Sequence, residues 1–218
     1  MLALYAHPFA SFCWKVLIAL YERDLAFEYR QVDDAHPEHT AALKALWPVG
    51  QFPVLVDGDV SVIESSVIVE HLDLHHGAAP PMIPRDAKAA LAVRMFDRVV
   101  DDYVQVPMQR IVADFIRVPA DRDPLTVEQA TATLQKAYGW LETQVAGRTW
   151  AVGETFSLAD AAAAPALFYA DWVVPIGEDC PSLRAYRARL LARPSVARVV
   201  DAARPWRRYF PPGAPDRD

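Results

Sequence analysis

The chain has 218 residues, of which 53% are hydrophobic and 23% charged, and this composition excludes extended disorder. Its formal net charge of −6 argues against a nucleic-acid partner, because such binding depends on neutralising phosphates. No segment is long and apolar enough to predict a membrane span, and the start MLALYAHPF lacks the charged region of a signal peptide. With two cysteines, Cys13 and Cys180, the sequence predicts a soluble protein of a reducing compartment, the cytoplasm.

The first third of the chain alternates strand and helix patterns. In order, these patterns predict a strand at residues 2–5, a helix at 11–21, a strand at 27–32, a helix at 37–46, two short strands around a turn at Asp57–Gly58–Asp59, and a helix from Glu64. This βαβαββα order predicts an α/β domain with a mixed four-stranded sheet over residues 1–77.

Residues 78–85 mark a break, because three prolines in five residues exclude a helix interior or a central strand. We expect this segment to be a linker. After it the patterns predict only helices, at residues 86–116, 126–145, 157–173, 182–191 and 195–203. Residues 86–218 should therefore form an all-α domain. Within it, Ser157 and Asp160 form a variant capping box, and the apolar helix that follows is predicted to be central.

The segment from Gly50 to Leu72 contains the clearest candidate binding site. Pro53 opens a strand that we expect at a sheet edge, where unpaired backbone groups can bond an extended ligand as an added strand would. The start of the next helix favours a carboxylate, and Glu64 beside it suits an ammonium. This unit can therefore hold both charges of an α-amino acid head group and the peptide behind it.

Four stretches, HPFASFCWKVLIALYE, GQFPVLVDG, IESSVIVEHL and TFSLADAAAAPAL, resemble the cytosolic glutathione S-transferase family. The likeness covers essentially the whole chain, and its N-terminal motif is similar to that of the serine-type, zeta-, phi- and tau-like classes. The resemblance implies a thioredoxin-like domain joined to a helical domain, glutathione as co-substrate, and a homodimer. A small hydrophobic electrophile would be the second substrate.

The resemblance also implies roles for individual residues. Pro53 would be the family's cis-proline, and the backbone of Val54 would pair with the cysteinyl part of glutathione. Glu64 and Ser65 would bind the γ-glutamyl head group, and Gln51 would lie near the glycyl carboxylate. Ser65 could also be an ordinary N-cap, and the two roles are compatible because a capping serine lies at the anion-binding end of a helix.

Catalysis in this family means lowering the pKa of the glutathione thiol, because the thiolate is the nucleophile. A drop of about two units corresponds to roughly 2.7 kcal/mol, which one hydroxyl and a helix dipole could supply. The resemblance places Ala10 where serine-type members carry the hydroxyl. Ser11 is therefore the first candidate donor, with Cys13 or a backbone N–H of the same turn as alternatives. Without a cysteine at position 10, a dithiol mechanism is not expected, and Cys13 is predicted to be a buried structural residue.

An electrophile pocket is expected between the two domains, where small-molecule clefts commonly form. Candidate lining residues are Phe9, Tyr103, Met108, Phe115 and Trp172, although the same apolar stripe would also suit a core.

Two clusters of polar residues are predicted to have other roles. Asp97, Asp101 and Asp102 should form a solvated face, and by resemblance to family dimers Asp101, ahead of Asp97, could reach the partner subunit's glutathione ammonium. His71 and His75 lie one helical turn apart, but no further ligand is placed near them. We therefore expect a solvated helix end and no metal site.

Three functions remain open from the sequence. The first is a transferase that activates the glutathione thiol toward an electrophile. The second is an isomerase on the same scaffold that returns glutathione unchanged. The third, suggested by Ala10, is a binding or scaffolding protein without catalysis.

Overall fold

A four-stranded mixed sheet with helices on both faces is built by the N-terminal part of the chain. In the computed structural model, which describes residues 1–77 and 80–218, strand β1 (Leu2–Ala6) pairs in parallel with β2 (Phe27–Gln31) and antiparallel with β3 (Val54–Asp57). Strand β4 (Val60–Ile63) pairs antiparallel with β3, so the order is β2-β1-β3-β4. Gly58, in the turn between β3 and β4, has a φ of +59°, which glycine adopts without steric cost.

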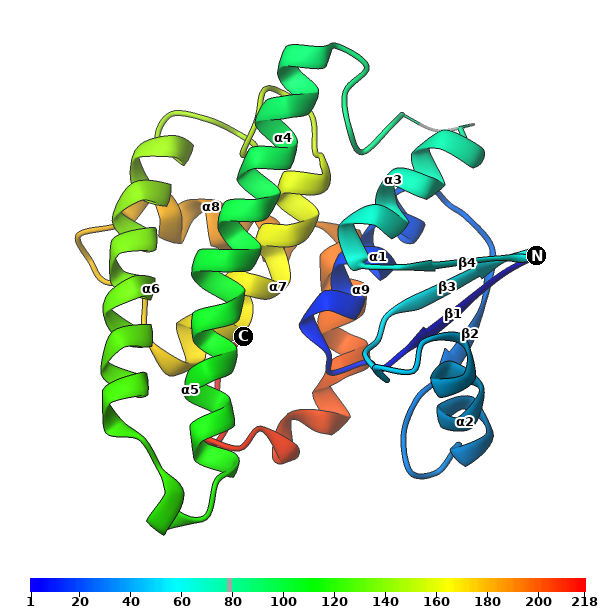
Figure 1. Ribbon diagram of the computed structural model, residues 1–218. Helices are drawn as coiled ribbons and strands as arrows, with labels where there is room; N and C mark the ends of the chain where they lie inside the picture. The colour runs from blue at the N-terminus through cyan, green and yellow to red at the C-terminus, as the bar shows by residue number, and fades with distance from the viewer. Residues whose placement is uncertain (78–79) are drawn as a thin grey trace.

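The two faces of the sheet have separate cores because strand side chains alternate between them. Leu2, Leu4 and Leu55 face helices α1 (Ser11–Glu22) and α3 (Ser65–His75) and join the main core. Tyr5 and Val54 face helix α2 (Pro37–Leu46) on the other side. Figure 1 shows α1 between the sheet and the helical half of the molecule.

Strand β3 is an interior strand, which corrects the prediction that it lies at a sheet edge. Val54 pairs with Tyr5 on one side and with Ile63 on the other, and β4 is the edge. Pro53 is tolerated because it precedes the first paired residue, so the ladder lacks no N–H there.

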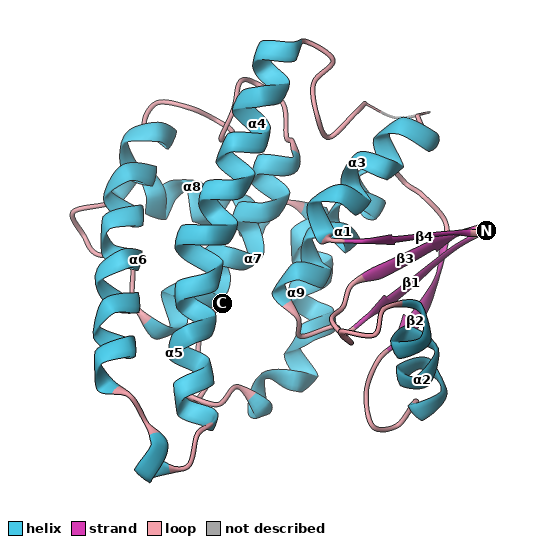
Figure 2. Ribbon diagram, viewed as in Figure 1, coloured by secondary structure: helices cyan, strands magenta, loops and turns pink. Residues whose placement is uncertain are grey.

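The helical half consists of α4 (Ala87–Val100), a π-helical turn (Asp101–Gln105), α5 (Val106–Ile116), α6 (Pro124–Val145), α7 (Leu158–Val173), α8 (Pro181–Ala192), α9 (Pro194–Ala203) and short 3₁₀ turns at Pro119–Asp121 and Arg204–Tyr209. Figure 2 shows strands in only one half of the molecule, so the predicted fold class is confirmed. Helix α7 packs against α1 and α4 and is buried from Leu158 to Trp172, as its apolar sequence predicted.

The capping box at the start of α7 is also present. The Asp160 carboxylate accepts hydrogen bonds from the Ser157 N–H at 2.9 Å and the Ser157 hydroxyl at 3.0 Å. It accepts further bonds from the Ala151 N–H at 2.8 Å and the Tyr186 hydroxyl at 2.7 Å. This buried carboxylate therefore joins three separate segments of the chain.

The single helix predicted at residues 86–116 is interrupted by the π-helical turn. Here the Val106 N–H bonds to the Asp101 carbonyl, five residues back. Pro107 explains the change, because it has no N–H for the carbonyl of Tyr103 and its ring would crowd that carbonyl in a regular α-helix. A wider turn ahead of the proline relieves this conflict.

Of the linker predicted at residues 78–85, residues 78–79 lie outside the described part of the chain, and 80–85 contain neither helix nor strand. The N–H groups of Met82 and Ile83 donate to the carboxylate of Asp73 at 3.0 and 2.8 Å, which ties this segment to α3. Across residues 1–77 and 80–218, no helix has the length and apolar character needed to cross a bilayer.

Candidate functional site

Two adjoining hollows lie where the sheet meets the helical half, and both are lined by Phe12, Gln51 and Phe52. The smaller, of about 150 Å³, also contacts Glu64 and Ser65 at the start of α3. The larger, of about 350 Å³, lies between the start of α1, helix α5 and the C-terminal segment. A polar hollow thus continues into a mainly apolar one.

The polar hollow is built around a strained turn. Glu64 is exposed and has a φ of +68°, a left-handed conformation that is uncommon for any residue other than glycine. Such strain costs on the order of 1–3 kcal/mol and is found most often at functional sites. The turn presents the Glu64 carboxylate beside the first residue of α3, Ser65, whose side chain is buried. The N–H groups at the start of α3 have no partners within the helix, so this hollow offers an acid and an anion-binding helix end together.

Phe52 lines the hollows and Val54 does not, so the prediction for Val54 is wrong in this respect. Val54 is fully buried, lines neither hollow, and has strand partners on both sides. Phe52 lines both hollows, and neither its N–H nor its C=O bonds to another described residue. The Phe52–Pro53 peptide bond is cis. The residue before the proline, and not the one after it, is therefore open to an extended ligand.

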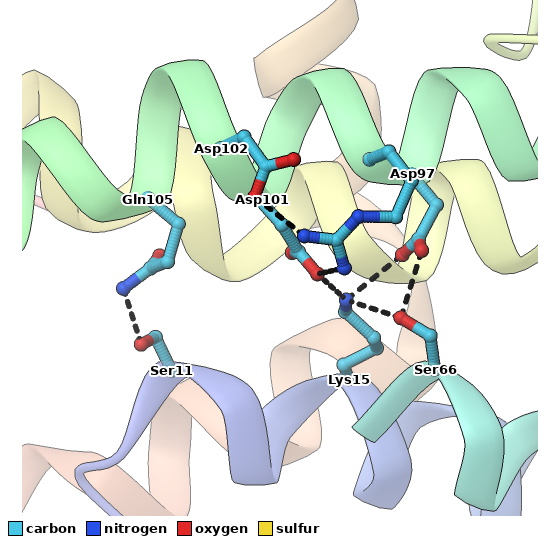
Figure 3. Close-up of polar contacts among 8 residues, drawn as sticks. Ser11, Lys15, Ser66, Asp97, Asp101, Asp102 and Gln105 are labelled. Atoms are coloured by element: carbon cyan, nitrogen blue, oxygen red, sulfur yellow. Dashed lines mark hydrogen bonds and ion pairs between the residues drawn. The ribbon is translucent and has the colours of Figure 1, made fainter. Parts of the chain in front are cut away.

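Ser11 begins helix α1 and lines the larger hollow beside Ala10. Its Oγ accepts a hydrogen bond of 2.5 Å from Nε2 of Gln105, which comes from the π-helical turn (Figure 3). Because Gln105 is the donor, the hydroxyl proton of Ser11 is free to point toward a ligand. The Oε1 atom of Gln105 is buried and has no hydrogen-bond partner within the described residues. Sequence reasoning missed Gln105, since it lies 94 positions from Ser11.

Cys13 is fully buried and lines neither hollow. Burial raises the pKa of its thiol to about 12, despite an opposing backbone hydrogen bond from His7. The thiol therefore stays protonated at neutral pH and is far from being a reactive thiolate.

Two of the five predicted pocket residues, Phe9 and Met108, line the larger hollow. Trp172 is buried behind the wall, with its ring centroid 5.1 Å from that of Phe210. Tyr103 is 54% exposed and Phe115 is 43% exposed, and neither lines the hollow. These two predictions were wrong because an apolar residue on a long helix can face core, cleft or solvent, and a linear pattern does not separate the three.

Several lining residues were not predicted from the sequence. They include Gln109, Val112 and Ile116 on α5, Tyr169 on α7, and Tyr209 and Phe210 near the C-terminus. The hydroxyl of Tyr169 donates to the carbonyl of Phe9 at 3.0 Å and so joins α7 to the loop before α1. The one available signal was the aromatic C-terminal tail, which could be expected to pack over the junction between the two halves.

Comparison with known proteins identifies the family. Residues 4–80 match the model of the glutathione S-transferase N-terminal domain, and residues 99–194 match that of the C-terminal domain. Glutathione S-transferase 1 of Dianthus caryophyllus is 30% identical over 165 residues, which cover 74% of each chain. The chain belongs to the glutathione S-transferase family.

Two further relatives extend the likeness over almost the whole chain. A glutathione S-transferase from Methylobacterium radiotolerans, crystallised with glutathione sulfonate, is 28% identical with a TM-score of 0.79 over 91% of this chain and 94% of its own. A probable maleylacetoacetate isomerase of Vibrio cholerae is 27% identical over 94% of this chain and 97% of its own length.

In this glutathione S-transferase family member, a buried ion network joins helix α1, the start of α3 and helix α4 (Figure 3). The Nζ atom of Lys15 lies 2.8 Å from Oδ1 of Asp97 and 2.6 Å from Oδ2 of Asp101, and it donates to the Ser66 hydroxyl at 3.0 Å. Ser66 in turn donates to Oδ2 of Asp97 at 2.7 Å. Ser66 follows Ser65, so the turn that faces the hollow is joined to helix α4 through this network.

Asp97 and Asp101 therefore do not form the predicted solvated face, because they are only 2% and 4% exposed. Of the three acids, only Asp102 is exposed, where it pairs with Arg98. Sequence reasoning placed all three outside because it could not see that Lys15, on α1, approaches this side of α4. The carboxylate of Asp101 is bound to Lys15 within its own chain.

In this network two carboxylates share one ammonium group, and this arrangement affects the pKa of Asp101. Burial raises the pKa of Asp101 above its ordinary value; Lys15 opposes this shift and the neighbouring charge of Asp97 adds to it. Lys15 is therefore the main group that favours the ionised form of Asp101 in the interior.

Proposed function

We propose that the protein is a glutathione transferase that holds glutathione in the smaller hollow and presents its thiol to a hydrophobic electrophile in the larger one. The observation that carries this proposal is that a polar, charge-bearing hollow and an apolar hollow share Phe12, Gln51 and Phe52. A tripeptide with charged ends fits the first, and a neutral co-substrate fits the second.

The polar hollow supplies a partner for each charged group of glutathione. We assign the γ-glutamyl ammonium to Glu64 and the γ-glutamyl carboxylate to Ser65 with the N–H groups that open α3. Gln51 would bind the glycyl carboxylate. The cysteinyl backbone would pair with the free N–H and C=O of Phe52, in place of Val54, because Phe52 lines both hollows and Val54 lines neither.

Ser11 is proposed as the donor that stabilises the glutathione thiolate, with Gln105 holding its hydroxyl in position. A hydrogen bond to a charged group contributes about 1.5–3 kcal/mol, and the N-terminus of α1 adds up to about 1 kcal/mol. Together these match the roughly 2.7 kcal/mol that a two-unit drop in the thiol pKa requires. This role supports membership of the serine-type, zeta-, phi- and tau-like classes, with the hydroxyl one position later than usual because residue 10 is alanine.

We also propose that the protein acts as a homodimer in the cytoplasm. Family membership supports the dimer, and the two cysteines, Cys13 and Cys180, are buried and unbridged and so fit a reducing compartment. For the electrophile, the aromatic walls formed by Phe9, Tyr169 and Phe210 favour a flat apolar molecule.

The test is an ultraviolet titration of the thiol of bound glutathione in the wild type, Ser11→Ala and Ala10→Ser. We expect a pKa about two units below that of a free thiol in the wild type, and a rise of about one to two units in Ser11→Ala. Calorimetry should show glutathione binding in all three proteins. A depressed pKa that survives Ser11→Ala would move the donor to a backbone N–H of the same turn. An undepressed pKa in the wild type would favour a binding protein without catalysis.

A second candidate function is a glutathione-dependent isomerase, favoured by the similarity to the Vibrio cholerae protein. Such an enzyme would also need the thiolate, but it would return glutathione unchanged. Product analysis with unsaturated dicarboxylic acids separates the two functions. Isomerised product with no loss of glutathione would replace the transferase proposal, whereas a conjugate formed with an apolar electrophile would support it.

A further inference from the structure

Two histidines and an aspartate converge at the end of the sheet remote from both hollows. Asp57 is the last residue of β3, His71 lies in the later part of α3, and His76 follows its last residue. The Nε2 atoms of His71 and His76 lie 3.0 and 2.7 Å from the same oxygen, Oδ2 of Asp57. The prediction of a solvated histidine-rich helix end was therefore wrong for these two residues, because β3 supplies a third group that the helix sequence could not reveal.

We propose that Asp57, His71 and His76 form a binding site for a divalent transition-metal ion, with zinc as the ion that fits best. Imidazole nitrogen and carboxylate oxygen are ligands that zinc prefers, at about 2.0–2.2 Å from the ion. Ligands of a tetrahedral ion at that range lie about 3.3 Å apart. The three ligand atoms all lie within 4.8 Å of one another, so they can close around an ion by small side-chain rotations.

The backbone around the site is already held in place. The N–H of His76 donates to the carbonyl of Leu72 at 2.9 Å, and its own carbonyl accepts a bond from Nη2 of Arg23 at 2.5 Å. Asp57 is paired with Leu2 and Val60 in the sheet. A site built on a strand and a helix end is more exact than one on a free loop, and less ordering is needed when the ion binds.

Access to the site is open, since the side chains of His71, His76 and Asp57 remain 13%, 27% and 22% exposed. An ion can enter from solvent, and water can complete its coordination as a fourth ligand. An ordinary pair of hydrogen bonds would use the same contacts without metal, so the measurement must detect the ion itself.

The test is calorimetric titration of the full chain with zinc chloride, using protein that carries no polyhistidine tag and buffer without glutathione or chelators. We expect one zinc ion per chain in the wild type. His71→Ala and His76→Ala should each weaken binding at least about tenfold, because even groups that only support a metal ligand change affinity by about 10–100-fold. Asp57→Asn, which keeps a hydrogen-bond acceptor and favours folding, should weaken it similarly.

The matched control is His36→Ala combined with His39→Ala. These rings stack at 5.3 Å beside Asp33 and so resemble the site in composition, but their groups do not converge as a ligand set. Zinc affinity should be unchanged in this variant, and cobalt added in place of zinc should give a tetrahedral absorption band that only the site variants lose. No zinc binding in the wild type, or zinc affinity in His71→Ala and His76→Ala equal to that of the wild type, would overturn the proposal. Glutathione affinity, measured in parallel, reports on the other site separately.

Discussion

Replacing Lys15 with methionine would remove the ammonium from the buried network while keeping a flexible side chain of similar length. Lys15 is 1% exposed, and its two carboxylate partners, Asp97 and Asp101, are 2% and 4% exposed. In the variant, Asp97 keeps the hydroxyl of Ser66 at 2.7 Å, and Asp101 keeps Arg98 at 3.2 Å. Both carboxylates would then remain in the interior with weaker partners.

Removing one partner of a buried ion pair costs about 3–5 kcal/mol. Because each carboxylate of this network retains one contact, we expect the lower end, about 3 kcal/mol. For a chain of this size, 1 kcal/mol shifts the unfolding temperature by roughly 2–4 °C, so the midpoint should fall by about 6–12 °C. Ser66 also loses a contact, and glutathione affinity should therefore fall together with stability.

Urea unfolding and calorimetry with glutathione measure the two effects. A variant that combines Lys15→Met with Asp97→Asn and Asp101→Asn serves as the control, because it removes the uncompensated charges. It should recover most of the lost free energy of unfolding, and the difference gives the coupling within the network. A loss below about 1 kcal/mol in Lys15→Met, or a triple variant as unstable as the single one, would refute the reasoning.

Three other contacts have effects that can be measured separately. Gln105→Leu should raise the pKa of the bound glutathione thiol by up to about one unit in the ultraviolet titration, because Ser11 loses the 2.5 Å bond that holds it; an unchanged pKa would exclude this positioning role. Asp160→Ala should cost at least about 3 kcal/mol in urea unfolding, since four donated hydrogen bonds lose their acceptor. Burial opposes ionisation of Glu22, but its hydrogen bonds with Arg193 hold its pKa below the ordinary 4.5. Ionised Glu22 should therefore stabilise the fold by about 1 kcal/mol above that pH, and this stabilisation should be lost as the pH falls through the folded-state pKa. Unfolding midpoints of wild type and Glu22→Gln should accordingly differ at neutral pH and converge in acid; a constant difference would contradict this.

Local sequence patterns were sufficient for the main elements of the fold. The alternation of strand and helix before residue 78 and the helical periods after residue 85 predicted the two halves. The capping box of Ser157 and Asp160, and the burial of the apolar helix behind it, were also predictable, because capping and periodicity depend on residues only a few positions apart. Pro107 was a sequence signal for the π-helical turn, but the helical pattern around it is uninterrupted and therefore predicted a single helix.

Assignments that depended on distant partners could not be made from the sequence. Whether β3 lies at an edge is decided by its pairing with β1, and this pairing left Phe52 rather than Val54 open to the hollows. The burial of Asp97 depends on Lys15, which is 82 positions away in the chain.

By itself, the sequence determined that this protein has an α/β half and a helical half, and it predicts a charged turn at Glu64 and Ser65 as a site for an amino-acid head group. Those features arise from interactions between near neighbours in the chain. Only the tertiary structure decided which groups meet: Ser11 with Gln105, and Asp57 with His71 and His76. The physical reason is that hydrogen bonds and metal ligation act over about 2–3 Å, and side chains far apart in sequence reach that range only after strands and helices have packed.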